Sequence, residues 1–114
     1  MAKFKYESVP MDNIGTTPVE LIEAKEGQIL LLTSLSLTNK LNTGITTTVE
    51  VFSSSFGDWI TIVKNAQIPK GSTLPALGSQ KITLNQLDKI RVSANQNNAI
   101  DARLSLASTT TDAP

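Results

Sequence analysis

The sequence predicts an all-β fold: a single antiparallel β-sandwich or jelly-roll-like domain with an extended N-terminal arm. Three observations support this prediction. Apolar and polar residues alternate with a period of two along most of the chain. Turn-forming residues interrupt the alternation about every eight to twelve positions. Helical periodicity is absent, and Ser, Thr and Asn supply 33 of the 114 residues, which is typical of outward strand faces.

The two ends of the chain are expected to lie outside the main domain. Residues 1–15 read as an extended arm in which Phe4 and Tyr6 alternate with lysines before the breaker at Pro10. Such an arm can pair with its own sheet or with the sheet edge of a neighbouring copy, and both alternatives stay open. Residues 16–108 form the predicted sandwich, and 109–114 form a polar tail.

The clearest strand is predicted over residues 28–39. Its period-two face contains Ile29, Leu31 and Leu35, which we expect to point into the core. Leu30 and Leu32 then lie on the opposite face, as an apolar surplus that another chain or an overlying loop must cover. Further strands are expected at 17–24, 45–54, 59–64, 80–84, 89–94 and 100–107.

The connections are predicted from turn chemistry. Residues 39–44 and 96–98 are rich in Asn, which tolerates positive φ, so each reads as the loop of a hairpin. In the second hairpin a register with Arg91 opposite Ser105 avoids facing two arginines. The run 59–64 is apolar on both faces and is expected to be covered on both sides. Residues 65–77 contain two prolines and are expected to form an edge or a crossing segment.

Composition excludes most catalytic and nucleic-acid functions. The chain has no Cys and no His, so zinc sites, thiol nucleophiles and His-dependent triads cannot be built from it alone. Ten basic and ten acidic residues cancel, so no field attracts nucleic acid or a membrane surface. No apolar run is long enough for a signal peptide or a membrane span. We therefore predict no enzyme, no cofactor and no metal.

The acidic residues within the predicted sandwich have structural interpretations. Asp58 and Asp88 lie in turns, where a carboxylate bonds nearby backbone amides. Glu50 and Asp101 occupy outward strand positions, and no spacing selects a catalytic pair. Asn95, Asn97 and Asp101 lack the glycine and terminal glutamate of a calcium loop.

Aromatic and surplus apolar residues indicate an interface. All five aromatics lie in the first 59 residues, and aromatic side chains are common anchors of protein contacts. Core packing is an equally good interpretation for Trp59. A carbohydrate-binding module using Trp59 and Phe56 is an alternative of another class. The candidate interface residues are Phe4, Tyr6, Leu30, Leu32, Phe56, Trp59, Ile60 and Ile62.

Residues 28–107 resemble small virion structural proteins of tailed bacteriophages. The segment 68–74, beginning Ile68-Pro69, matches an "I-P-x-G-x-x-L" stretch of that group. The segment 84–92 follows its "L-x-x-G-D-x-I/L-x-V" stretch, and a final hairpin closes the pattern. Leu87 departs from it, because it stands where the pattern has a glycine.

The resemblance implies a non-catalytic protein present in many copies on a virion. A capsid decoration (cement) protein is the favoured expectation, with a head-to-tail, tail or fibre component as the alternative. Its implied partners are further copies of the chain, with a trimer favoured, and the major capsid protein or other virion proteins. The expected location is the virion, after assembly in the host cytoplasm.

Overall fold

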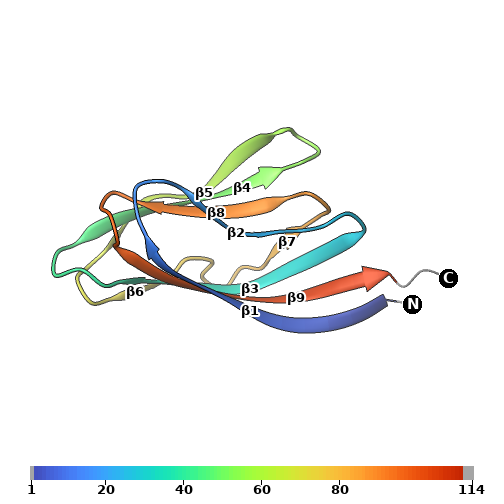
Figure 1. Ribbon diagram of the computed structural model, residues 1–114, viewed down its shortest axis with the longest axis horizontal. Coiled ribbons are helices and arrows are strands. Elements are labelled where there is room, and N and C mark those ends of the chain that lie inside the picture. The colour runs from blue at the N-terminus through green and yellow to red at the C-terminus, as the bar shows by residue number, and fades with distance from the viewer. Residues whose placement is uncertain (1, 112–114) are drawn as a thin grey trace.

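The computed structural model describes residues 2–111, with side chains for residues 5–109, and contains no helix in that range. The all-β prediction is confirmed. Two antiparallel sheets pack face to face (Figure 1). Their strands are β1 (Ala2–Ile14), β2 (Val19–Glu23), β3 (Gln28–Asn39), β4 (Ile45–Ser53), β5 (Asp58–Ile68), β6 (Thr73–Pro75), β7 (Ile82–Leu84), β8 (Lys89–Ala94) and β9 (Ile100–Thr111).

The strand order is that of a jelly roll. One sheet, called sheet A here, has the order β1-β9-β3-β6, and β7 pairs with β3 beside β6. The other, sheet B, has the order β2-β8-β4-β5. Apart from the β4–β5 hairpin in sheet B and the neighbouring β6 and β7 in sheet A, successive strands alternate between the sheets, as in a double Greek key. Four loops lie at one end of the sandwich, and three turns lie at the other together with both chain termini (Figure 1).

Strand β3 changes the face that it buries. Leu30 and Leu32 are 1% and 0% exposed, so the prediction that they lie on the outer surface is wrong. The register with β9 shifts between Leu32 and Ser34, which inserts one residue and reverses the alternation. Leu35 is consequently buried as predicted, whereas Ile29 and Leu31 point outward. Simple period-two counting cannot detect this bulge.

The two predicted hairpins are instead connections between the sheets. Residues 40–44 lead from β3 in sheet A to β4 in sheet B, and residues 95–99 lead from β8 in sheet B to β9 in sheet A. The predicted register is therefore wrong: Arg91 lies opposite Glu50 and Glu20 in sheet B. Turn residues mark where the chain reverses, but they do not determine whether the next strand pairs with the last.

The N-terminal arm pairs in cis. It is strand β1, whose register with β9 runs from Ala2 opposite Thr111 to Ile14 opposite Ile100. Strand β9 continues to Thr111, so the prediction of a tail beginning at 109 is wrong, and the rest of that tail lies outside the described residues. Sequence alone missed this extension because polar strand residues and a polar tail have the same composition.

Strand β5 is an exposed edge. It pairs with β4 alone, and most of its side chains face solvent, so the prediction that 59–64 is covered on both sides is wrong. Its register with β4 shifts twice, around Val49. Asn65 has a φ of 50° at one of these irregularities, and its backbone N–H donates to Thr48 Oγ1 at 3.2 Å. The bulges bend the strand away from the sandwich.

Asn39 fixes the first connection between the sheets. The side chain is buried, its Nδ2 donates to the carbonyl oxygens of Thr43 and Ile68 at 2.8 and 3.0 Å, and its Oδ1 accepts the Leu41 N–H at 2.8 Å. We expect Asn39→Ala to lower the free energy of unfolding by about 2–4 kcal/mol, because it leaves buried backbone groups without partners. Urea denaturation measures this.

Asn42→Ala, in the same loop but exposed, is the matched control and should stay within about 0.5 kcal/mol of wild type. Equal stabilities for the two variants would contradict the role assigned to Asn39.

Candidate functional site

Exposed large apolar side chains gather at one end of the sandwich. They lie near the start of β1, near the start of β3, in the β4–β5 hairpin and in the β7–β8 turn, which share the end that holds both termini (Figure 1). We call this surface the apolar end. Tyr6 and Phe56 are 83% and 73% exposed. The full set of exposed large apolar side chains is Tyr6, Ile29, Leu31, Phe56, Ile60, Ile62 and Leu87, of which Ile62 lies apart, beside the bulge near the middle of sheet B.

A buried carboxylate locks the turns of the apolar end together. Asp88 Oδ1 accepts the Ser54 N–H at 2.8 Å, and its Oδ2 accepts the Asn85 N–H at 3.0 Å. The backbone N–H of Ala24 donates to the Asp88 carbonyl at 2.9 Å. These bonds connect the β7–β8 turn to the β4–β5 hairpin and to the end of β2. The prediction that Asp88 bonds turn amides is confirmed.

Leu87 adopts a conformation that favours glycine. Its φ is 70°, in the left-handed region, and its N–H donates to the Ala24 carbonyl at 2.6 Å. A glycine at this position would adopt the conformation without strain. Gln86 extends the connection, because its Oε1 accepts the Gly27 N–H of the β2–β3 turn at 3.0 Å. All three turns of the apolar end thus form one hydrogen-bonded unit.

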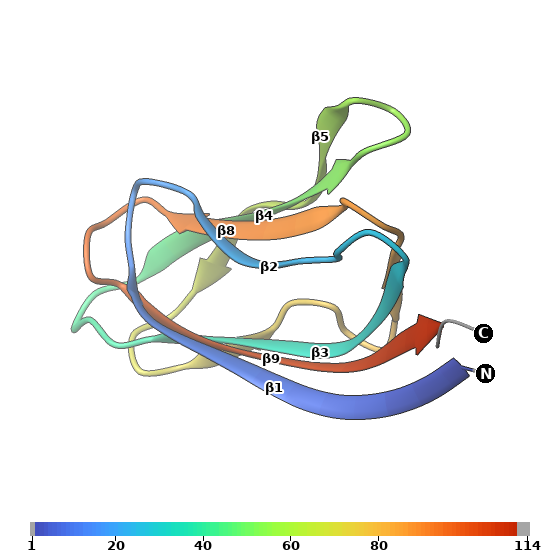
Figure 2. The ribbon, with the colours of Figure 1, turned by 45° about the vertical axis from the view of Figure 1, so that its right-hand side comes forward.

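The β4–β5 hairpin projects beyond the body of the sandwich (Figure 2). Ile60 lies opposite Val51 on the face that would normally meet sheet A, yet it is exposed because the hairpin bends away from that sheet. Ile62 lies where the register shifts, and Phe56 occupies the turn at the tip. The hairpin therefore presents apolar side chains to solvent on a well-defined backbone.

Aromatic and cationic side chains support the other face of the hairpin. Phe52 and Trp59 are cross-strand partners whose ring centroids lie 5.4 Å apart, edge to face. The guanidinium of Arg91 lies 3.8 Å from the Trp59 ring centroid, and its Nε donates to Glu50 Oε1 at 2.9 Å. Lys89 Nζ lies 5.2 Å from the centroid of Phe52. Packing thus explains Trp59, and Arg91 covers one of its faces.

A second part of the apolar end lies on the outer face of sheet A. Tyr6, Ala107 and Leu31 are direct neighbours across β1, β9 and β3, so their side chains form one row. Ala107 is covered by its larger neighbours but does not belong to the core cluster. Ile29 continues this surface toward the β2–β3 turn. In the register of the sheet, Ile29 is aligned across β9 with Phe4 of β1. The side chain of Phe4 lies outside the described residues.

The predicted interface residues other than Phe4, whose side chain lies outside the described residues, divide into three groups. Tyr6, Phe56, Ile60 and Ile62 are exposed, as an interface requires. Leu30 and Leu32 belong to the core, and Trp59 is packed in the hairpin. Sequence reasoning missed Ile29, Leu31 and Leu87. Of these three, only Leu87 could have been noticed in the sequence, because it stands where the turn pattern has a glycine. A residue that breaks a local rule in this way is often found at a functional site.

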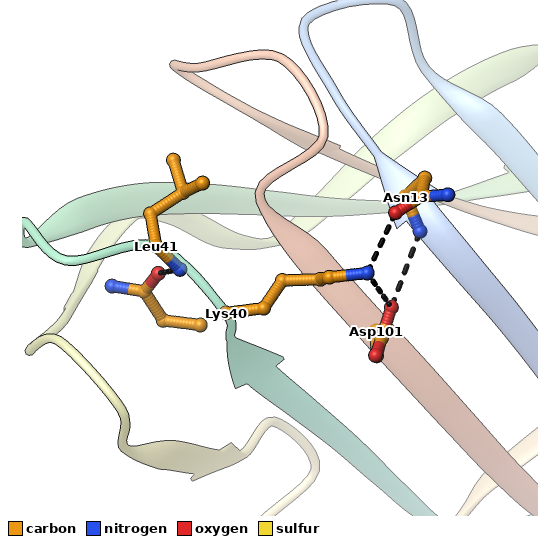
Figure 3. Close-up of polar contacts among 5 residues, drawn as sticks. Asn13, Lys40, Leu41 and Asp101 are labelled. Carbon is orange, nitrogen blue, oxygen red and sulfur yellow. Dashed lines mark hydrogen bonds and ion pairs between the residues drawn. The ribbon is translucent and has the colours of Figure 1, made fainter.

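The opposite end of the sandwich is polar. Lys40 Nζ lies 2.7 Å from Asn13 Oδ1 and 3.3 Å from Asp101 Oδ1, and Asp101 also accepts the Asn13 N–H at 3.2 Å (Figure 3). This cluster joins β1, the β3–β4 connection and β9. All three side chains are solvent-accessible, so it contributes little to stability.

The remaining chemistry of the described residues is structural. No group of three or more acidic, His or Cys side chains among residues 2–111 could hold a metal ion. Glu50 pairs with Arg91, and Asp58 accepts the N–H of its neighbour Trp59 at 2.7 Å. Within the same range no helix is long and apolar enough to cross a membrane.

Comparison with known proteins finds chains that share the fold but does not assign this chain to a family. No protein-family model matches the sequence, and the curated proteins give no match. A chain from Bacillus endospore appendages, which form disulfide-linked pili, aligns over 99% of this chain and 92% of its own, with a TM-score of 0.55 and 14% identity. A chain of the T13 infectious bursal disease virus particle gives a TM-score of 0.53 and 13% identity over 94% of this chain.

This chain spans 31% of that viral chain, about a third of its length. A chain of the cyanophage Pam1 capsid aligns with a TM-score of 0.45 and 18% identity, over 96% of this chain and 85% of its own, a likeness too loose for inference. At these identities the first two comparisons establish a shared fold.

Asp88→Ala tests the hydrogen-bonded unit. We expect it to lower the free energy of unfolding by about 2–4 kcal/mol, because the Ser54 and Asn85 amides lose a charged acceptor. Amide hydrogen exchange should rise in both the 53–57 and the 85–88 turns. Asp58→Ala, which removes an exposed carboxylate that bonds only its neighbour, is the control, at about 1 kcal/mol or less. Faster exchange confined to 85–88 would contradict the proposed coupling.

Proposed function

We propose that this protein is a non-catalytic structural subunit of a virus particle, and specifically a decoration protein on a phage head. In this proposal a small homo-oligomer, with a trimer favoured, binds the major capsid protein or neighbouring virion proteins. The observation that carries the proposal is the apolar end. Single exposed apolar residues are ordinary, but a collected set rimmed by polar residues is characteristic of protein contacts.

The rigidity of the apolar end supports a docking role. Three turns share hydrogen bonds through the 85–88 segment, and the hairpin is supported by the Phe52–Trp59 pair. Little conformational entropy is lost when a surface is ordered before binding, so a modest contact area suffices. Repetition over a symmetric particle then multiplies weak contacts through avidity.

The structural comparisons are compatible with an assembling subunit. The two chains that share the fold come from a pilus and from a virus particle. The present chain contains no Cys, so contacts between its copies would be non-covalent, unlike those of the disulfide-linked pili. A carbohydrate platform needs an open ring face, and Arg91 occupies one face of Trp59, so we do not pursue that alternative.

The proposal is tested by locating the chain on particles. Virions purified from the source of the sequence should carry it on the head, as detected by immunogold labelling and by mass spectrometry of separated heads and tails. Labelling confined to tails would contradict decoration and favour the tail or fibre alternative. Absence from purified particles would contradict both.

Phe56→Ser should weaken rebinding of the purified chain to heads stripped of it by about tenfold or more. It removes the most exposed aromatic of the hairpin, and loss of contacts between copies lowers the avidity of the oligomer for the head just as loss of a direct contact does. Co-sedimentation measures the bound fraction. Ser55→Ala, at the adjacent exposed position, is the control and should bind as wild type. Unchanged binding of Phe56→Ser would place the contact elsewhere.

A further inference from the structure

The two ends of the sandwich differ in surface chemistry. Apart from Ile62, which lies beside the bulge near the middle of sheet B, every large apolar side chain that is strongly exposed between residues 5 and 109 belongs to the apolar end. The four loops at the other end display mainly Asn, Thr, Lys and Gly, with the cluster of Asn13, Lys40 and Asp101 at its centre (Figure 3). The exposed apolar side chains thus lie on one half of the molecule, on the outer face of sheet A and on the β4–β5 hairpin with the β7–β8 turn.

The molecule also exposes more surface than a compact monomer of its mass. Its accessible area is 6744 Å², against about 6,100 Å² expected for 12.2 kDa. Its radius of gyration is 14.6 Å, against about 13.3 Å for a compact domain of this length. Both differences reflect an elongated shape, with extents of 53 × 27 × 22 Å.

We propose that the occupant of the apolar end is the apolar end of a second copy of this chain, so that copies converge on a rotation axis and form a closed oligomer. A head-to-tail filament needs an apolar surface on the opposite end to receive this one. Among residues 5–109, no large apolar side chain is strongly exposed there. Contact between like ends is therefore the arrangement that covers the apolar side chains with this chain alone.

Charges at the apolar end permit contact between identical surfaces. Lys5 Nζ lies 3.2 Å from Glu7 Oε1, and in the β2–β3 turn Lys25 precedes Glu26. Opposite charges thus occur side by side, so two copies brought together experience no net repulsion from these groups. A uniformly charged end would disfavour such an approach.

Leu87 serves as an anchor of this contact. Its left-handed φ of 70° would be unstrained in glycine, yet the position holds a leucine that is 48% exposed. The hydrogen bond from Leu87 N–H to the Ala24 carbonyl, and the one that the Asp88 carboxylate accepts from Ser54 N–H, maintain the conformation. Strain held at an exposed apolar residue is explained if the side chain contributes to binding.

Single-cysteine variants test the geometry, because the chain has no native Cys. Ser55 lies at the apolar end and Asn42 at the polar end, and both are exposed. Under mild oxidation Ser55→Cys should form covalent dimers, whereas Asn42→Cys should stay monomeric. A head-to-tail arrangement would instead cross-link only a mixture of the two variants, and that result would overturn the proposal.

Leu87→Gly tests the anchor. We expect its dilute monomer to melt about 2–4 °C higher than wild type. Relief of backbone strain in the folded state outweighs the extra conformational entropy that glycine gives the unfolded chain. Its dissociation constant for self-association, from sedimentation equilibrium, should rise at least about tenfold. Asn42→Ser should change neither value. A gain in melting temperature with unchanged association would overturn the anchor role.

The inference concerns self-association and is separable from the proposed function. A wild-type chain that remains monomeric at about 100 μM, far above the concentration that a standard interface requires, would overturn it even if the chain is found on phage heads. A closed oligomer that is absent from virions would support this inference while contradicting the proposed function.

Discussion

The apolar end depends on a change of buried face within strand β3. Before the bulge at Thr33, Leu30 and Leu32 fill the core; after it, Leu35 and Leu37 do so. Without the extra residue, one half of the strand would turn its leucines to solvent. The bulge is held by Thr33, whose hydroxyl donates to the Ser105 carbonyl at 3.1 Å. Core filling therefore leaves Ile29 and Leu31 on the outer face of sheet A.

Much of the fold could be predicted from the sequence because strand formation is encoded locally. The bounds of β3 and β8 match the alternation of their residues, and Asp88 bonds turn amides as its position suggests. Which strands pair could not be predicted. Residues 40–44 and 95–99 have the composition of hairpin loops but connect two sheets, since that choice depends on the packing of the whole chain.

Part of the candidate site could also be predicted, because local residue patterns mark some of its exposed side chains. Tyr6 and Phe56 are recognisable as exposed aromatics beside breakers and turn residues. Ile29 and Leu31 have the same composition as the core leucines beside them, and only the register shift with β9 distinguishes the two sets. Exposure of Ile60 follows from how far the hairpin bends away from sheet A (Figure 2), a property of both sheets together.

The sheet edges favour contacts through side chains over contacts through backbone. Strand β1 carries Pro10 and a largely exposed Lys5, and β5 is bent by two bulges, one of which contains Lys64. Strand β6 ends at Pro75. Proline, lysine and bulges each hinder the addition of a further strand. Because these edges resist pairing, the side chains of the apolar end are the part of the described surface best suited to assembly.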